Sequence, residues 1–387
     1  MSSVLGTYAR KNIAFIEGKG SYLFTKNGDK YLDFVQGIAT NILGHCHDHL
    51  VKTIQKQSKK LWHTSNAFVI PDQEKLAKRL TDNSFADFVC FQNSGTEATE
   101  ASIKIARKYF HKIGKPEKNR IITFKGAFHG RTLAALFAAN NPKHTEGFGP
   151  KVDGFDQVPF ADHEAIKKAI NKNTAAIMIE TIMGEGGIKV VPDFCLKGLR
   201  NLCDEHEILL ILDEVQSAYR TGNFFAFEPS GIKPDIVPIA KGIGGGFPLG
   251  ACLVTKKVSV GMTAGTHGST FGGNPLAMAV GNAVLDIIFE KDFFTKVKQK
   301  GEYFKQGLSK IKEKYPKIVG EIRGIGLMIG LKMFVDNTEF MKKLMKNKML
   351  TVKAEDNVIR LFPPLIVSNS ELDEAIDIIE AVCQKMS

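Results

Sequence analysis

The chemistry of this sequence centres on one lysine that follows a short apolar run and precedes a glycine-rich stretch. Lys241 comes directly after PDIVPIA (residues 234–240), and four of the next five residues are glycines. Desolvation of an ammonium favours the neutral amine, which forms Schiff bases with carbonyl compounds. Alternatively, a lysine at a strand end extends its ammonium into water and does no chemistry. The rest of the chain has to supply partners before the chemical interpretation is preferred.

An acid and a helix N-terminus follow two other apolar runs. Asp213 ends ILLILD (residues 208–213), where a carboxylate is costly to bury unless a cation such as a protonated pyridine nitrogen pairs with it. The capping box at residues 94–97 includes Gly95 and Thr96, and the N–H groups of such a helix start are suited to phosphate. Taken singly, the acid can be a helix cap or an ion-pair partner, and most capping boxes only cap a helix.

An aromatic ring, an arginine and two hydroxyls complete the set. Phe128 and Arg131 follow the run RIITF, where the ring can stack on a planar ligand and the guanidinium can bind a carboxylate with two hydrogen bonds. Ser269 and Thr270 lie among glycines in GTHGSTFGGNPLA and suit phosphate or carboxylate. In isolation the ring is a core aromatic and the arginine a surface residue. Together with an amine, an acid and a phosphate cradle, they describe a site for a phosphorylated pyridine aldehyde.

The elements that must position these residues alternate between short apolar runs and helical patterns. This alternation predicts an α/β fold with a mostly parallel sheet, in which ligands gather at the carboxyl ends of the strands. An Asn-Gly turn between two β-like runs near the N-terminus predicts a hairpin. After about residue 285 the pattern changes to that of a smaller α+β unit. The predicted strands are residues 87–91, 120–124, 175–180, 208–213 and 234–240.

Length and composition exclude several classes of protein. A chain of 387 residues with 43% hydrophobic and 24% charged residues fits a globular protein of two domains. The net charge of +11 raises the question of nucleic acid, but the lysine-rich segment 296–317 has helical spacing and is interpreted as a solvated helix face. We therefore expect no nucleic-acid partner.

The cysteines and the hydropathy of the sequence indicate where in the cell the protein is located, and the histidine-rich cluster raises the question of a metal site. The six cysteines lack C-x-x-C spacing, no signal core is present at the N-terminus, and no apolar stretch is long enough to span a membrane. We therefore expect a cytoplasmic protein with no membrane partner. The cluster HCHDH (residues 45–49) cannot direct all of its side chains at one ion, so we expect no metal site.

The motifs named above closely resemble those of the class III, or ω-amino acid, aminotransferases, which use pyridoxal 5′-phosphate. The resemblance runs over nearly the whole chain, through YLDFVQGIATNILGHCH, FQNSGTEATEASIKIAR, FHGRT, LDEVQ, AKGIGGGFPLGA, GTHGSTFGGNPLA and VIRLFPPL. It implies an enzyme of PLP-dependent fold type I that works as a homodimer. It also implies a large domain at residues 49–284 and a small domain built from residues 285–387 together with the segment 1–48.

The resemblance also assigns cofactor contacts. It implies that Lys241 holds pyridoxal phosphate as a Schiff base and that Asp213 binds the pyridine nitrogen. Phe128 would lie against one face of the ring, and Val215 and Gln216 would contact the other face and the phenolic oxygen.

The resemblance also assigns residues that bind the cofactor phosphate and the substrates. Gly95 and Thr96 would hold the phosphate, helped by the partner subunit's Thr270. The resemblance further implies four substrate contacts. Arg131, with Ser269 nearby, would bind the α-carboxylate of the donor, Arg360 would bind 2-oxoglutarate, and Glu185 would cover Arg360 while the donor is bound.

The reaction that the resemblance implies is transamination between N2-acetyl-L-ornithine and 2-oxoglutarate, a step of arginine biosynthesis. Ornithine, succinylornithine, succinyl-diaminopimelate and 4-aminobutyrate remain alternative donors, and a PLP-dependent aminomutase remains an alternative reaction. Two positions depart from the family pattern. Thr181 replaces a usual proline, and DEVQSAYRTG is one residue shorter than the corresponding family loop, which leaves open the contacts of Tyr219 and Arg220.

Overall fold

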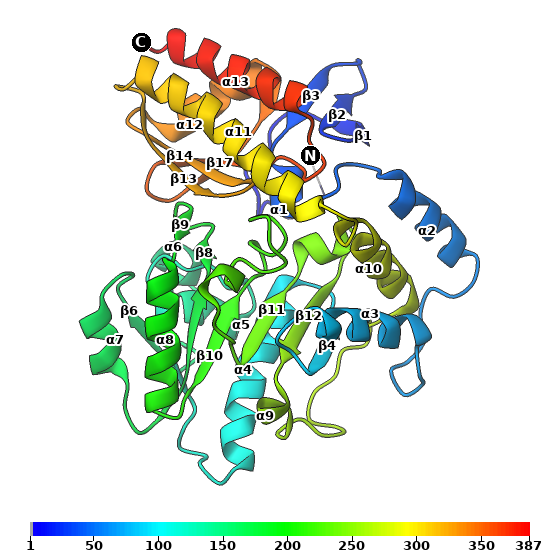
Figure 1. Cartoon of the computed structure of the whole chain (residues 1–387), viewed down its shortest axis with the longest axis vertical. Coiled ribbons are helices and arrows are strands. Elements are labelled where there is room, and N and C mark those ends of the chain that lie inside the picture. The colour runs from blue at the N-terminus through cyan, green and yellow to red at the C-terminus, as the bar shows by residue number, and fades with distance from the viewer. Residues whose placement is uncertain (1–2) are drawn as a thin grey trace.

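The computed structural model describes residues 3–387 and has a large lower part and a smaller upper part (Figure 1). The lower part is organised by a seven-stranded sheet in the order β4-β12-β11-β10-β7-β5-β6. Only β12 runs against the other strands. The strands are β4 (Phe88–Gln92), β5 (Arg120–Phe124), β6 (Phe155–Val158), β7 (Thr174–Glu180), β10 (Leu209–Asp213), β11 (Ile236–Ile239) and β12 (Gly250–Val254).

The predicted α/β fold with a mostly parallel sheet is therefore confirmed. All five apolar runs named from the sequence form strands of this sheet, and β6 and β12 are the two that the sequence analysis did not name. Because six of the seven strands share one direction, their carboxyl ends meet at a single edge. That edge faces the smaller part of the molecule (Figure 1).

Helices cover both faces of this sheet, since alternate residues of each buried strand point to opposite sides. Ile211 and Ile236 pack on one side, against α4 (Gly95–Lys112), α5 (Leu133–Ala139) and α9 (Lys256–Ser259). Leu212 and Val237 pack on the other side, in a core that includes the second set of helices. That set is α3 (Pro71–Asp82), α7 (His163–Ala169), α8 (Asp193–Glu205) and α10 (Pro275–Ile288).

The smaller part contains two four-stranded sheets, and one of them joins the two ends of the chain. The predicted hairpin is confirmed as β2 (Tyr22–Thr25) and β3 (Lys30–Asp33), and β1 (Phe15–Lys19) extends it. β15 (Met349–Leu350) pairs with β3 in parallel. The second sheet has the order β13-β14-β17-β16, with β13 (Val319–Ile325), β14 (Met328–Met333), β16 (Val352–Ala354) and β17 (Val358–Leu361). The domain limits at residues 48 and 284 stay a prediction.

Three helices pack on these small sheets: α11 (Phe293–Lys314), α12 (Asn337–Lys346) and α13 (Asn369–Gln384). The lysine-rich segment forms most of α11, with Phe304, Leu308 and Ile311 buried, so its interpretation as a helix with one apolar face is confirmed. No helix within residues 3–387 combines the length and the apolar character needed to cross a bilayer.

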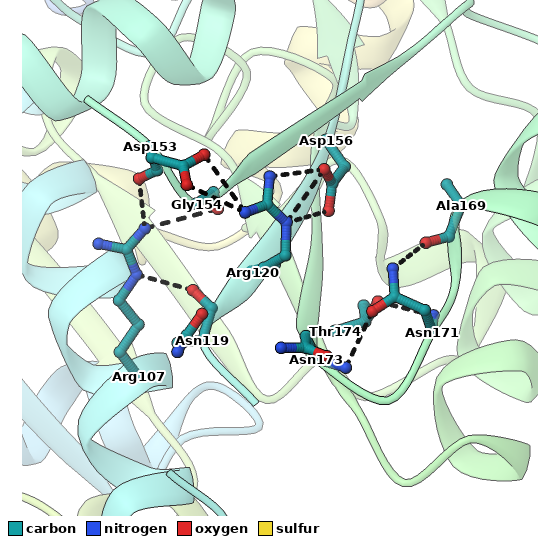
Figure 2. Close-up of polar contacts among 10 residues, drawn as sticks. All are labelled: Arg107, Asn119, Arg120, Asp153, Gly154, Asp156, Ala169, Asn171, Asn173 and Thr174. Atoms are coloured by element: carbon teal, nitrogen blue, oxygen red, sulfur yellow. Dashed lines mark hydrogen bonds and ion pairs between the residues drawn. The ribbon is translucent and has the colours of Figure 1, made fainter. Parts of the chain in front are cut away.

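The edge of the large sheet opposite to the one facing the small part is fastened by polar contacts (Figure 2). At the start of β5, Arg120 binds Asp156 through Nε and Nη2 at 2.9 and 2.8 Å, and its Nη1 lies 3.2 Å from Asp153. Arg107 of α4 donates from Nε to the carbonyl of Asn119 at 2.9 Å. These bonds join the starts of β5 and β6 to each other and to α4.

The side chains of the histidine-rich segment at the start of α2 (Asp48–Ser58) make structural contacts. His45 Nε2 lies 2.8 Å from Asp33, His47 accepts a cap bond from the N–H of His49, and His49 Nε2 lies 2.9 Å from Asp286. Across residues 3–387 no cluster of three or more His, Cys, Asp or Glu side chains is arranged to hold a metal ion.

Short elements connect these parts. Strands β8 (Ile182–Met183) and β9 (Lys189–Val190) form a small hairpin after β7, and α6 (Pro142–Thr145) follows α5. The turns are η1 (Glu228–Ser230), η2 (Lys241–Gly244) and α1 (Gln36–Ala39). In α1 all four residues have positive φ, from 48° to 66°, although only Gly37 is a glycine.

Candidate active site

Lys241 lies at the carboxyl edge of the sheet, in the first position of η2 after β11. Its φ is +50°, in the left-handed region that side chains other than glycine rarely adopt, and such strain persists where the surrounding structure demands it. Burial, followed by the charge of Arg360, lowers the pKa of its ammonium to about 8. Among residues 3–387 the ammonium has no hydrogen-bond acceptor. The structure thus presents a free, easily deprotonated amine.

A buried acid, Asp213, ends the adjacent strand β10. In the sheet register Asp213 stands beside Glu180, the last residue of β7. Its Oδ2 lies 2.8 Å from Nδ1 of His129, and its Oδ1 accepts from the N–H of Val215 at 3.0 Å. Both Asp213 and His129 are buried, so a charged carboxylate here is matched by a nearby donor.

The pKa values in this cluster move in the directions that burial and charge dictate. Burial alone disfavours the His129 cation, but the hydrogen bond and charge of Asp213 outweigh it and raise the pKa of the imidazole. Burial raises the pKa of Glu180 to about 7, an effect that the electrostatic influence of His129 opposes and that of Asp213 increases. Asp213 thus has as neighbours an imidazole and a carboxyl group whose pKa values are both raised.

The start of α4 forms the predicted cradle. Ser94 accepts from the N–H of Glu97 as the N-cap, which leaves the first-turn N–H groups of Gly95 and Thr96 free of helical partners. A Cβ on Gly95 would lie 2.6 Å from Val215, so only glycine fits between this turn and the loop after β10. The cradle therefore lies directly beside the segment that begins with Asp213.

Thr96 is engaged through its side chain. Its Oγ1 accepts from the N–H groups of Arg131 and Thr132 at 3.1 and 3.2 Å and lies 3.0 Å from the Thr132 hydroxyl. The Thr132 hydroxyl in turn donates to Glu100. With these bonds the Thr96 hydroxyl is occupied, so its backbone N–H is the group left for an anion.

The loop after β5 carries the predicted aromatic ring and arginine. The N–H of Phe128 donates to Glu180 at 2.9 Å, which fixes the loop to the end of β7. The guanidinium carbon of Arg131 lies 5.5 Å from the centre of the Phe128 ring, and its Nη2 lies 3.2 Å from Nε2 of His144. Arg131 is exposed and has no carboxylate partner among residues 3–387.

Gln216 and Val215 follow Asp213 and face neighbouring loops. A Cβ on Gly184 would lie 1.9 Å from Oε1 of Gln216, so the glutamine packs on the backbone of the loop after β7. This Oε1 is buried and has no hydrogen-bond partner within residues 3–387. An unpartnered buried polar atom at the edge of the site calls for a ligand or a water.

Arg360 and Glu185 form an ion pair although they are 175 residues apart. Nη1 of Arg360 donates to Glu185 at 2.7 Å, and Nη2 donates to the carbonyl of Lys353 at 2.9 Å. Arg360 is 1% exposed, whereas Glu185 is about one-third exposed. The acid is therefore the partner that is free to move.

Ser269 and Thr270 occupy a loop near the cradle. Ser269 Oγ accepts from the Asn93 amide at 3.2 Å, next to the start of α4. Thr270 is exposed and bonds to no residue in the described part of the chain. The structure thus brings Ser269 to the cradle of its own chain and leaves the Thr270 hydroxyl on the surface.

The shortened loop after Gln216 buries its two central residues. Tyr219 is wholly buried with φ +72°. Arg220 is also wholly buried and donates to the carbonyls of Leu327 and Pro363, while its guanidinium carbon lies 5.3 Å from the Phe362 ring. Burial lowers the pKa of Arg220 to about 9. The loop thus ties the large sheet to the strands of the small part without touching the bonds of Asp213.

Three further polar residues of the site were not among the predicted site residues. Glu180 ends an apolar strand as Asp213 does, and the same signal identifies it. His129 lies between Phe128 and Arg131, but nothing in its neighbours predicts a bond to Asp213, which is 84 residues away. His144 carries no local signal, since its neighbours in the short helix α6 are polar.

Comparisons with known proteins agree with this architecture. The model of the family "Aminotransferase class-III" matches residues 7–383. Acetylornithine aminotransferase from Agrobacterium fabrum (strain C58) is 54% identical over 382 residues, covering 98% of this chain and 96% of that protein.

Solved structures agree as well. N-acetylornithine aminotransferase from Stenotrophomonas maltophilia K279a matches with a TM-score of 0.86 at 33% identity, covering 98% of this chain and 97% of that one. Ornithine aminotransferase from Toxoplasma gondii, in a structure with partial occupancy of pyridoxal phosphate at its active site, matches with a TM-score of 0.94 at 31% identity, covering 98% and 92%.

The fold is thus that of a PLP-dependent enzyme of fold type I, as predicted. This chain belongs to the class III aminotransferases and depends on pyridoxal 5′-phosphate.

Proposed function

We propose that this enzyme transfers the terminal amino group of N2-acetyl-L-ornithine to 2-oxoglutarate, giving N-acetylglutamate 5-semialdehyde and glutamate in arginine biosynthesis. The assignment of the substrate rests on the 54% identity, over 98% of this chain, to an acetylornithine aminotransferase. The two separate arginines, Arg131 and Arg360, support it, because the donor and the keto acid each need a carboxylate partner.

The residues at the carboxyl edge of the sheet fit the cofactor. Gly95 leaves room where any Cβ would collide, the first-turn N–H groups of α4 suit a phosphate, and the unpartnered Oε1 of Gln216 lacks a bond that a ligand can supply. Asp213 supplies the anion that a protonated pyridine nitrogen needs, and Lys241 supplies the amine. We therefore keep the cofactor contacts expected from the family as proposals for these residues.

Each residue has a proposed task. When bound, pyridoxal phosphate supplies an aldehyde that condenses with amines and a ring that takes up electrons. Lys241 would hold the aldehyde, and as a neutral amine it would remove a proton from the substrate and return it. Asp213 would keep the ring nitrogen protonated. Phe128 and Val215 would enclose the ring from either side.

Gln216 would contact the phenolic oxygen, and the N–H groups of Gly95 and Thr96, with the partner's Thr270, would bind the phosphate. The occupied hydroxyl of Thr96 favours its N–H group for this task.

The substrates would use the two arginines in turn. Arg131, with Ser269 nearby, would bind the α-carboxylate of the donor, whose reactive amine lies at the far end. While the donor is bound, Glu185 would neutralise Arg360, as it does in this structure. When 2-oxoglutarate enters, the partly exposed Glu185 would swing away and leave Arg360 to the substrate carboxylate.

Turnover of a panel of donors with 2-oxoglutarate tests this proposal. The panel comprises N-acetylornithine, succinylornithine, ornithine, succinyl-diaminopimelate and 4-aminobutyrate, and each is assayed for glutamate formation. We expect the highest kcat/KM for N-acetylornithine. A preference for ornithine over its N-acetylated form would contradict the proposal, and turnover without 2-oxoglutarate would indicate an aminomutase.

Replacing Arg360 separates the two half-reactions. We expect Arg360→Ala to raise the KM for 2-oxoglutarate by about 10²-fold, the effect of losing a two-pronged charged contact, and to change the KM for N-acetylornithine far less. Steady-state kinetics with both substrates varied measure this. Arg120→Ala, at the opposite edge of the sheet (Figure 2), is the matched control and should leave the ratio of the two KM values unchanged. Equal effects of Arg360→Ala on both substrates would argue against the assignment.

We also propose that the enzyme is a homodimer in the cytoplasm. A surface patch next to Thr270 exposes large apolar side chains, and such patches mark protein contacts. Hydrogen bonds from Asn66 to the carbonyls of Ser269 and Gly272 join its two segments. The patch consists of Leu61, Trp62, Phe68, Val69 and Phe271. The cytoplasmic location is supported by the free state of every cysteine in the described chain.

A charge placed in this patch tests the dimer. We expect Phe271→Asp to convert the enzyme to monomers in analytical ultracentrifugation and to weaken pyridoxal phosphate binding, since the partner's Thr270 would be lost from each site. Phe194→Asp, which charges a phenylalanine on α8 that is more exposed than Phe271, serves as the control and should remain dimeric. A wild-type enzyme that sediments as a monomer would contradict the proposal.

A further inference from the structure

His144 of α6 is hydrogen-bonded to the arginine that we assign to the donor. Nη2 of Arg131 lies 3.2 Å from Nε2 of His144. The His144 ring also meets the Phe128 ring edge to face, at 6.3 Å and 89°. Arg131 itself lies over Phe128. The three side chains therefore form one contact group at the entrance of the site, beside a cavity of about 390 Å³ that Phe128, His144 and Glu185 help to line.

This contact exists only while the imidazole is neutral. An arginine has N–H donors and no acceptor, so Nε2 of His144 has to offer its lone pair, with the ring proton on Nδ1. A protonated imidazole carries a proton on both nitrogens and has no lone pair to offer. Protonation thus replaces an attraction by the repulsion of two cations about 3 Å apart.

The charges around His144 favour the neutral ring. Burial has the largest effect and, together with the positive Arg131 and Lys143, lowers the pKa of the imidazole, while Glu185 and Glu355 act in the opposite direction. Lys353 of β16 lines the same cavity, with its ammonium 3.1 Å from the Thr338 hydroxyl. Since an ordinary histidine titrates near pH 6.5 and burial lowers this pKa, His144 is neutral at pH 8 and gains its proton only below pH 6.5.

The backbone that carries His144 is fixed to the rest of the site. The Asn141 amide, which caps α6, donates to the Glu355 carboxylate at 3.0 Å. The N–H of Glu355 donates to the carbonyl of Glu185 at 2.9 Å. The turn between β16 and β17 therefore fixes the backbone of α6. Because of this, the His144 ring can hold the Arg131 guanidinium in place and does not move with it.

We propose that His144 is a positioning residue: its neutral imidazole holds Arg131 in the orientation that receives the α-carboxylate of the amino donor, and its protonation releases Arg131 and weakens donor binding. This inference rests on the proposed assignment of Arg131 to the donor. It adds a pH-dependent control of donor binding that does not act directly on Arg360, whose hydrogen bonds go to Glu185 and Lys353.

Calorimetric binding of an unreactive donor tests the inference without using turnover. N-acetyl-L-norvaline keeps the N-acyl group and the α-carboxylate, which stays ionised at pH 5, but lacks the reactive amine. For the wild-type enzyme loaded with pyridoxal phosphate, we expect its dissociation constant to rise about tenfold from pH 8 to pH 5, as for the loss of one hydrogen bond to a charged group.

Two variants separate positioning from mere packing. In His144→Gln the amide oxygen accepts from Arg131 at every pH, so we expect tight binding at pH 8 and a nearly flat profile down to pH 5. In His144→Leu no acceptor remains, and binding should be about tenfold weaker already at pH 8. His163→Gln, which changes a surface histidine of α7, is the control and should keep the wild-type profile.

The outcomes distinguish this inference from the proposal on which it rests. If Arg131→Leu binds N-acetyl-L-norvaline as tightly as wild type does, the assignment of Arg131 itself fails. If Arg131→Leu binds weakly but His144→Leu binds normally, or if His144→Gln keeps the wild-type pH profile, only the role of His144 is overturned.

Discussion

Lys241→Ala is expected to lower kcat by a factor of about 10⁴, the upper range for losing a positioned acid–base group. On the proposed assignment of Lys241, the substitution removes both the covalent hold on the cofactor and the amine that moves the proton. The phosphate cradle at Gly95 and the acid at Asp213 remain, so the variant should still bind pyridoxal phosphate noncovalently. Stopped-flow measurement of each half-reaction gives the rate, and borohydride treatment followed by mass spectrometry should show no covalent gain.

The large expected loss of kcat agrees with the high neutral fraction of the Lys241 amine. With its pKa lowered to about 8, roughly a quarter of Lys241 is neutral at pH 7.5, whereas about one in a thousand ordinary lysines is. Burial and the nearby Arg360 thus raise the supply of neutral amine by about two orders of magnitude. No other lysine or arginine of the described site combines a lowered pKa with the absence of a hydrogen-bond acceptor, since Arg220, whose pKa is also lowered, donates to two carbonyls.

Lys241→Arg is the matched variant. It keeps a positive charge and a long side chain, but a guanidinium stays protonated and neither forms the covalent link nor accepts a proton. We expect it to be as inactive as the alanine variant, with thermal unfolding showing that both remain folded. Near-normal turnover in either variant would contradict the assignment of Lys241.

The site residues that follow strands were predictable because the topology of a parallel sheet places the ends of its strands side by side. Lys241, Asp213 and Gly95 each follow an apolar run, and in a parallel sheet such ends meet at one edge. β6 and β12 were the two strands missing from this prediction, and the five residues of β12, GACLV, include a glycine and an alanine, which are poor strand formers. The insertion of β12 between β4 and β11 does not disturb the edge, because only β12 is reversed.

The remaining site residues lie in segments whose local sequence pattern does not indicate a role in the site. Arg360 lies in β17 of a different sheet, and only the family resemblance pointed to it. His129 and His144 act through side-chain bonds to Asp213 and Arg131, and such bonds depend on tertiary packing that periodicity does not encode. The shortened loop shows the same limit, since nothing in its sequence indicates that Arg220 is buried.

Asp213→Asn should lower kcat by about 10³-fold, the upper end of what removing one charge-stabilising group from an active site costs, while leaving the fold and the covalent link intact. The amide has nearly the same shape, but it carries no charge to keep a proton on the ring nitrogen. The pKa of His129, raised by Asp213, should fall at the same time, since its partner is lost. Single-turnover rates with N-acetylornithine and with glutamate measure the effect in both directions.

Two comparisons show whether charge, and not packing, causes this loss. Asp235→Asn changes another buried aspartate, which binds Arg200 at the opposite edge of the sheet, so it should cost stability and leave kcat unchanged. A cofactor methylated on the ring nitrogen is cationic without a proton and so needs no acid to hold one. Loading Asp213→Asn with this analogue should recover a large part of the lost rate. Equal activity of the variant with either cofactor would mean that Asp213 supports the site only by packing and through His129.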